Sequence, residues 1–239
     1  MEKPFVVCHM LASLDGKIDG AFFGAPETAP ALKAYGELRG FYDCHATLYG
    51  TTTMLGGYAD GPAPALPEGG AGYPKEDYVN VDGRALGNYI VSVDSKGALG
   101  WHANTIEKKG RAKAHVIEVL TEQVTPAYLR YLRSFGISYL FAGKQTIDCA
   151  LALHKLKKLF AIDRLMIAGG GTVNWSFLQE GLIDELSLVI APVADGGTTA
   201  VSIFERADFL PAGQPVAFAL KEAKAVDKDS LWLRYETKR

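Results

Sequence analysis

The sequence predicts an α/β protein built on a mixed, mostly parallel sheet. Short apolar runs alternate with helix-like segments along all 239 residues, which is the pattern of an α/β domain. The segment 149–160 places apolar residues at helical spacing and lysines on the opposite face. The last two apolar runs, 216–220 and 231–235, alternate with a period of two and predict an antiparallel hairpin added to the sheet.

The remaining elements follow in order along the chain. Strands are expected at 5–10, 46–49, 89–93, 115–119, 138–142, 164–168 and 186–191. The run 186–191 is almost entirely apolar, as in a central strand buried on both faces. One helix is expected to start at Thr125 as N-cap, with Pro126 in the first turn, and to end at Gly136. A shorter helix is expected at 172–180.

Two stretches lack regular periodicity. The segment 56–87 is rich in Gly, Ala and Pro, and the segment 94–112 is rich in Gly and charge. Loops this long are uncommon in compact domains and usually cover a ligand or are disordered. No linker and no internal repeat interrupts the chain, so a single domain spanning 1–239 is expected.

Composition excludes several classes of function. A net charge of −2 argues against a nucleic-acid binder, which needs a basic surface. The apolar runs are too short to span a membrane. The three cysteines are far apart and odd in number, which indicates reduced thiols and a cytoplasmic location. The five histidines show no metal-binding spacing, so no metal is expected.

The strongest local motif is the segment 165–174, in which an apolar run meets three glycines and then a helix start. Glycines let backbone N–H groups approach a phosphate, and the positive end of the helix dipole favours an anion. The spacing differs from the dinucleotide fingerprint G-x-G-x-x-G because Asn174 occupies the place of the last glycine. Phosphate binding and a tight turn without a ligand both remain open on these residues alone.

Two further polar segments follow predicted strands. Asp15-Gly16 commonly forms a turn, and Ser13 or Asp15 could instead face a ligand at the strand's carboxyl end. The segment 50–53 places a glycine and three threonines after the second strand. Its hydroxyls could bind phosphate or ribose oxygens, or simply cap the next turn.

Four stretches, in this order along the chain, resemble the riboflavin-biosynthesis pyrimidine reductase family. They are 10–18, then Leu38-Arg39 with 46–50 and Thr53, then 93–95, and finally 167–174 running into 181–186 and 191–192. The resemblance implies the dihydrofolate reductase-like fold, which has three layers with helices on both faces of the sheet. It also implies NADPH as hydride donor, a small pyrimidine-like substrate whose C1′ receives the hydride, and a homodimer.

The resemblance also assigns roles to individual residues. The cofactor contacts that it implies are Leu11, Thr53, Ser95, Lys96, Gly169, Gly170, Gly171, Thr172, Val173 and Asn174. Lys96 beside Ser95 would suit the 2′-phosphate that distinguishes NADPH from NADH. Ser13 and Arg39 are the expected substrate contacts. Asp15 is the expected proton donor, on the premise that an enclosed carboxyl has a raised pKa.

The chain also departs from the family pattern. Gly57-Tyr58 stands where the family commonly has a pair of carboxylates, and Ala168 stands where a glutamate often precedes the glycines. No basic residue lies between Thr51 and Lys75, so an expected phosphate clamp is missing. The alternatives are therefore a non-catalytic nucleotide-binding module on the same fold and a dihydrofolate or pterin reductase. The second is disfavoured because the segment 13–17 is similar to the pyrimidine reductase branch.

Overall fold

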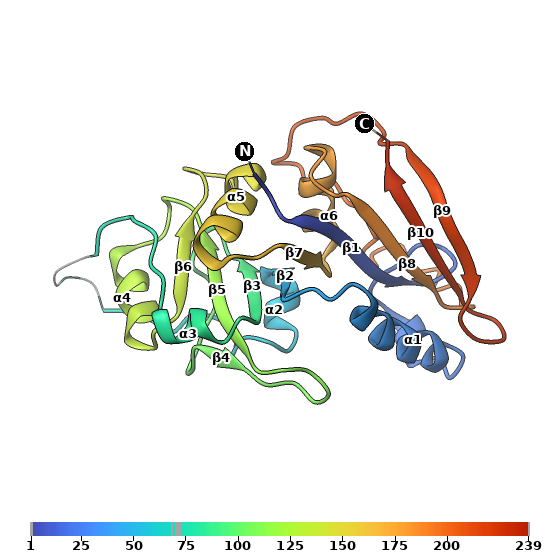
Figure 1. Ribbon diagram of the computed structural model, residues 1–239, viewed down its shortest axis with the longest axis horizontal. Coiled ribbons are helices and arrows are strands. Elements are labelled where there is room, and N and C mark those ends of the chain that lie inside the picture. Colours follow the sequence, from blue (N-terminus) through green and yellow to red (C-terminus); the bar gives the residue numbers. More distant parts are fainter. Residues whose placement is uncertain (1, 68, 70–72, 239) are drawn as a thin grey trace. The chain divides into compact units, whose positions relative to one another are not determined.

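The computed structural model describes residues 2–67, 69 and 73–238, and the chain forms two compact units (Figure 1). Unit 1 consists of Met1–Pro4 and His45–Asp163, and unit 2 consists of Phe5–Cys44 and Arg164–Arg239. No Pro- or Gly-rich linker marks any of the three points at which the chain passes from one unit to the other, which is why the sequence pattern predicts one domain. That the two units act as one domain stays a prediction.

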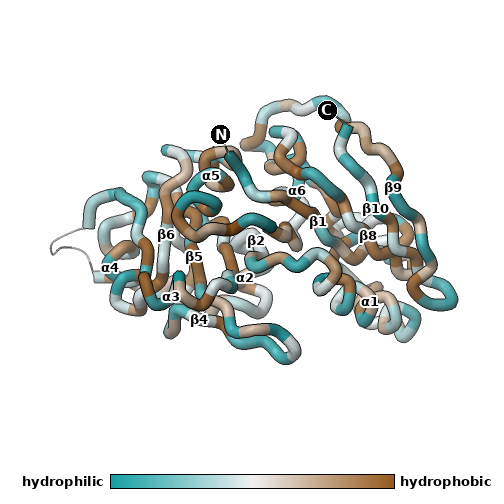
Figure 2. Tube along the Cα trace, in the orientation of Figure 1, coloured by the Kyte–Doolittle hydropathy of each residue, from teal (hydrophilic) through white to brown (hydrophobic). Residues whose placement is uncertain are grey.

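Unit 1 contains a sheet of four parallel strands with one short antiparallel strand. The parallel strands lie in the order β2 (Ala46–Gly50), β3 (Tyr89–Val93), β5 (Ala114–Leu120) and β6 (Ser138–Phe141). The strand β4 (Thr105–Ile106) pairs antiparallel with the first two residues of β5. All seven residues of β5 are buried, and Figure 2 shows the hydrophobic colour running along this strand.

Helices cover both faces of the unit 1 sheet. On one face, Phe160 at the end of α5 (Cys149–Phe160) packs edge-on against Tyr89 of β3. On the other, Tyr128 of α4 (Pro126–Ser134) lies over the end of β3 and bonds to Asp94. Two shorter helices, α2 (Thr51–Leu55) and α3 (Val81–Ala85), complete the unit. The caps follow the sequence signals, since the Thr125 side chain accepts the N–H of Tyr128, and Gly136 has a φ of 69°.

Unit 2 contains a five-stranded sheet in the order β7-β1-β8-β10-β9. The strands β7 (Arg164–Ile167), β1 (Phe5–Ala12) and β8 (Glu185–Ile190) are parallel. The strands β10 (Leu231–Thr237) and β9 (Phe218–Ala225) form the antiparallel hairpin, and β10 pairs with β8. Figure 1 shows α1 (Thr28–Phe41) and α6 (Gly171–Gln179) on opposite sides of this sheet. A short 3-10 helix, η1 (Ala21–Gly24), precedes α1.

The structure confirms the α/β class, the mostly parallel mixed sheet and the C-terminal hairpin, with strand ends displaced by at most two residues except that β9 ends five residues later than predicted. It adds α1, which the apolar pattern did not predict because its buried residues are the small Thr28, Ala31 and Ala34. It also places α3 and β4 within stretches expected to be irregular; residues 68 and 70–72 of the first stretch lie outside the described residues. Within the described part of the chain, no helix is both long and apolar enough to cross a membrane.

Candidate functional site

The candidate site in unit 1 lies where β2, β3 and β5 end. These strands are parallel neighbours, so their carboxyl ends meet at one edge of the sheet, where open α/β sheets bind ligands. Side-chain hydroxyls join the three strand ends. Thr51 Oγ1 donates to the carbonyl of Val93 at 2.9 Å, and Thr121 Oγ1 donates to the carbonyl of Ser95 at 2.6 Å.

The turn after β3 presents Ser95 and Lys96. Ser95 is half-buried and Lys96 is exposed, and among the described residues neither side chain has a partner. Oδ2 of Asp94 fixes the turn by accepting the backbone N–H groups of Ala98 at 2.7 Å and Leu99 at 3.0 Å. A hydroxyl and a free ammonium on an anchored turn can bind an anionic group. Thr53, in the first turns of α2, is also half-buried.

A pair of buried acids supports this edge of the sheet, and sequence reasoning missed it. Asp94 is 1% exposed and Glu118 is 0% exposed. Burial raises the pKa of both carboxyls, and for Glu118 the charge of Asp94 adds to the increase. Trp101 Nε1 donates to Glu118 Oε1 at 2.7 Å, whereas Glu118 Oε2 and the neighbouring Ser92 hydroxyl have no partner among the described residues. A glutamate inside an apolar strand was the signal available in the sequence.

The candidate site in unit 2 begins at the glycine bend between β7 and α6. Gly170 is the N-cap of α6, no side chain caps the helix, and the Gly169–Gly170 peptide bond is cis. Gly170, Thr172 and Val173 are half-buried, whereas Gly169 is buried. An uncapped first turn leaves backbone N–H groups that can bind an anion.

The segment 201–205 covers one side of the bend. A Cβ atom on Gly171 would lie 2.4 Å from the carbonyl oxygen of Ser202, so only glycine fits there. Asn174 is 0% exposed, and its side-chain amide donates to the carbonyl of Ile203 at 2.8 Å. The Asn174 side chain therefore holds the 201–205 segment, and the expected cofactor contact at Asn174 stays a prediction. Gly171 is likewise buried beneath the segment.

The structure also corrects the roles expected at the end of β1. Asp15 is exposed, and its carboxylate accepts hydrogen bonds from the Ser13 hydroxyl at 2.6 Å and from the N–H groups of Asp195 and Gly196 at 2.9 Å each. These bonds hold the pKa of Asp15 well below its ordinary value, the Ser13 bond most strongly. The premise of a raised pKa is wrong, and a carboxyl that stays ionised is a poor proton donor.

Two other expected contacts are buried in unit 2. The Ser13 hydroxyl is occupied by Asp15 and by the N–H of Lys17 at 2.9 Å, and the residue is only 2% exposed. Leu11 is 4% exposed and lies within the core along β1. The substrate contact expected of Ser13 and the cofactor contact expected of Leu11 stay predictions. Arg39 lies half-buried in the last turn of α1, close to His9 and Cys44, and its substrate role stays a prediction.

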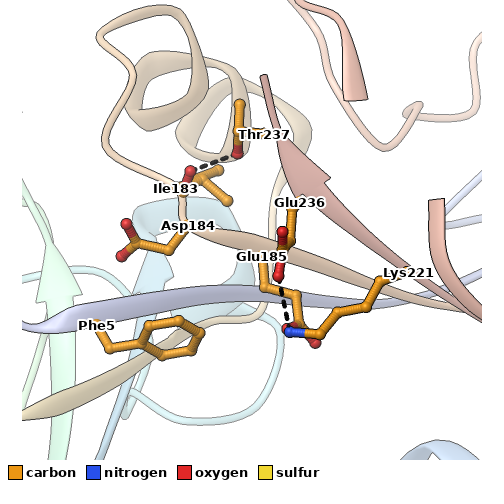
Figure 3. Close-up of a pocket in the computed structure, with 7 residues that line it drawn as sticks. All are labelled: Phe5, Ile183, Asp184, Glu185, Lys221, Glu236 and Thr237. Carbon is orange, nitrogen blue, oxygen red and sulfur yellow. Dashed lines mark hydrogen bonds and ion pairs between the residues drawn. The ribbon is translucent and has the colours of Figure 1, made fainter. Parts of the chain in front are cut away.

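The structure has a shallow cavity of about 280 Å³ elsewhere in unit 2 (Figure 3). Its lining residues are Phe5, Ile183, Asp184, Glu185, Lys221, Glu236 and Thr237. Phe5 and Glu185 begin β1 and β8, so the cavity is at the amino end of these strands, away from the glycine bend.

Lys221 in the lining and Arg234 nearby partly neutralise the three carboxylates that line this cavity. Figure 3 shows the ammonium of Lys221 close to Glu185 and Glu236, at 3.1 and 2.9 Å. Burial alone would raise the pKa of Glu185, but hydrogen bonds from Arg234, Tyr42 and Lys221 hold it below its ordinary value. These ion pairs engage the Lys221 ammonium, so it is not free to bind an anionic ligand.

These features define an α/β protein with polar groups at the carboxyl ends of parallel strands in each unit. The chain belongs to the RibD C-terminal domain family, whose model matches residues 4–232.

Individual relatives agree with this assignment. The chain is 28% identical over 230 residues to the 2,5-diamino-6-ribosylamino-4(3H)-pyrimidinone 5′-phosphate reductase of Methanothermobacter thermautotrophicus, covering 95% of each chain. It also has the fold of a pyrimidine reductase-like protein from Corynebacterium diphtheriae, with a TM-score of 0.67, 16% identity, and coverage of 99% of this chain and 92% of the other. For Acinetobacter baumannii RibD the TM-score is 0.65 at 22% identity, covering 99% of this chain and 58% of that one.

Proposed function

We propose that this protein is an NADPH-dependent reductase that acts on a ribosylaminopyrimidine 5′-phosphate. The observation that carries the proposal is the family match over residues 4–232, together with a relative named for this reduction that aligns over 95% of both chains. In this reaction a hydride adds to C1′ of the sugar, and the ring opens to a ribityl chain.

Each unit, taken by itself, presents groups that suit one phosphate-bearing part of a nicotinamide dinucleotide. In unit 1, the free side chains of Ser95 and Lys96 suit the 2′-phosphate, and Thr53 offers a hydroxyl at the neighbouring strand end. In unit 2, the N–H groups around Gly170 and Thr172 suit the diphosphate because no side chain caps α6. When bound, the cofactor supplies the hydride.

The protein's own residues position the reactants and exclude water. Asp94 holds the Ser95 turn through the amides of Ala98 and Leu99. Asp15 holds the loop at Asp195 and Gly196 beside the end of β1. Both carboxylates act through backbone N–H groups, so we assign them positioning roles and not proton transfer.

The decisive experiment titrates the purified protein with NADPH and NADH separately and then adds the aminopyrimidine ribosyl phosphate. We expect tight NADPH binding followed by oxidation on addition of this substrate. Binding of NADPH without oxidation by any pyrimidine or pterin would instead support the non-catalytic nucleotide-binding module.

A matched pair of variants tests the assignment of Lys96. In Lys96→Gln, KM for NADPH should rise about 10-fold because one charge-assisted bond to the 2′-phosphate is lost. KM for NADH should stay the same. Lys144→Gln, at an exposed lysine of the same unit, is the control and should change neither value.

We further infer a cytoplasmic homodimer. The three cysteines Cys8, Cys44 and Cys149 are free thiols, as suits a reducing compartment. The dimer is an implication of the family resemblance, and sedimentation equilibrium at micromolar concentration tests it.

A further inference from the structure

Four residues of unit 1 form a cluster that the proposed cofactor site does not use. Arg111, in the β4–β5 hairpin, donates from Nη1 to the hydroxyls of Tyr49 at 3.0 Å and Tyr58 at 3.1 Å. The two hydroxyls are 2.8 Å apart, and their rings are tilted together at 4.5 Å between centroids. Lys108 of the same hairpin lies over the Tyr58 ring, 5.0 Å from its centroid, and donates to the carbonyl of Gly57. We call Tyr49, Tyr58, Lys108 and Arg111 the hairpin cluster.

Some N–H and O–H donors of the hairpin cluster have no acceptor among the described residues. The two phenols carry two protons. Burial is the main cause that raises the pKa of Tyr58 to about 12, and the neighbouring Tyr49 adds to the increase. One proton serves the bond between the hydroxyls, so the other has no acceptor among the described residues. The Arg111 guanidinium has five N–H donors, and only Nη1 is engaged in the described contacts. Tyr49 is 3% exposed, so its side chain is held firmly in the core.

The hairpin cluster also carries positive charge that is not balanced. Among the described residues, neither Lys108 nor Arg111 has a carboxylate partner. Glu107, the nearest acid along the hairpin, is paired with Lys113 at 2.9 Å. The segment 52–74, which contains Tyr58, has no basic residue of its own, so both cations come from the hairpin. Two cations with spare donors form a complementary surface for a dianion.

We propose that the hairpin cluster binds a phosphate monoester, and that this phosphate belongs to the pyrimidine substrate. The second part rests on the proposed function. A phosphate monoester has the charge and the acceptor oxygens that a guanidinium and an ammonium can satisfy together. The substrate is the expected source because Tyr49 directly precedes the Gly50–Thr53 segment, while Ser95 and Lys96 already suit the cofactor's 2′-phosphate.

A binding experiment that needs no turnover tests the first part. Ribose 5-phosphate and ribose are titrated calorimetrically into the wild-type protein, Arg111→Gln and the control Lys109→Gln. The glutamine side chain removes the charge but is two bonds shorter than Nη1 of arginine, so thermal unfolding of each variant checks that the hairpin is still folded. We expect the wild type to bind ribose 5-phosphate in preference to ribose and Arg111→Gln to bind it about 10-fold more weakly. The control, an exposed lysine of the same hairpin, should bind like the wild type.

Steady-state kinetics identify the source of the phosphate. In Arg111→Gln, KM for the phosphorylated pyrimidine should rise about 10-fold while KM for NADPH stays the same, and Arg111→Lys should restore part of the loss. If KM rose for NADPH alone, with KM for NADH and for the pyrimidine unchanged, the cofactor's 2′-phosphate would lie at the cluster. That result would overturn the assignment to the substrate.

Equal binding of ribose 5-phosphate by the wild type and Arg111→Gln, with unchanged thermal unfolding, would overturn the phosphate site itself. Failure of the wild type to turn over any pyrimidine would reject the proposed function, yet the calorimetric result would still decide whether the cluster binds phosphate.

Discussion

The hydroxyl of Tyr128 donates a hydrogen bond to Oδ2 of Asp94 at 3.2 Å, and the two side chains are 2% and 1% exposed. The same oxygen accepts the N–H groups of Ala98 and Leu99, and the Tyr128 hydroxyl also contacts the carbonyl of Leu99 at 2.9 Å. One buried carboxylate oxygen therefore joins α4 to the turn that presents Ser95 and Lys96.

Removal of this oxygen should weaken both the fold and the turn. Asp94→Ala leaves the backbone N–H groups of Ala98 and Leu99 without an acceptor, which should lower the free energy of unfolding by about 3 kcal/mol. Asp94→Asn keeps one side-chain oxygen and should lose less than about 1 kcal/mol. Urea unfolding measures both values. Similar losses in the two variants would show that the charge, and not the oxygen acceptor, holds the turn.

The buried Glu118 should make stability depend on pH. Its pKa is raised in the folded state, so the folded protein binds this proton more tightly than the unfolded chain, and stability falls as pH rises above about 4.5 towards the raised value. Asp94, whose pKa is also raised, acts in the same direction. Glu118→Gln should therefore gain stability over the wild type with rising pH, by at most about 1.4 kcal/mol per pH unit.

Unfolding of the wild type and Glu118→Gln at several pH values measures this difference. Glu122→Gln, at an exposed carboxyl two residues after β5, is the matched control and should follow the wild type. A difference between Glu118→Gln and the wild type that does not change with pH would show that Glu118 is ionised throughout.

The sequence predicted elements well where one pattern dominates locally. The helix 149–160 and the cap at Thr125 were found because apolar spacing and capping residues agree. The helix α1 was missed because its buried face is made of small residues, which give little contrast in hydrophobicity. The site was predicted less well because burial is a tertiary property: Asn174 and Ser13 have polar side chains suited to a ligand, but neighbouring segments bind them instead. Arg111 could not be grouped with Tyr49 because 62 positions separate them in the chain.

The glycine bend should tolerate no side chain at Gly171, which the 201–205 segment covers. In Gly171→Ala the new Cβ would meet the backbone oxygen of Ser202 at 2.4 Å, so the 201–205 segment must move, at a cost of about 1–3 kcal/mol in the free energy of unfolding. Gly36→Ala makes the same chemical change in α1, where nothing lies within 4 Å, and should instead stabilise by about 0.5–1 kcal/mol. Chemical denaturation compares the pair. Stabilisation by both substitutions would mean that the segment is not packed on Gly171 in solution.

The carboxylate of Asp15 should affect activity through the loop that it holds and not through proton transfer. Because hydrogen bonds keep its pKa well below 3.8, Asp15 is ionised at every pH above about 4 and cannot produce a change in rate between pH 5 and 9. In Asp15→Asn, one of the two N–H groups of Asp195 and Gly196 loses its acceptor, so the loop should exchange its amide hydrogens faster and kcat should fall about 10-fold. The shape of the pH profile of kcat/KM should stay that of the wild type. If kcat/KM of Asp15→Asn instead lost its dependence on pH on one side of the profile, the carboxyl would be the proton donor and the positioning role would be refuted.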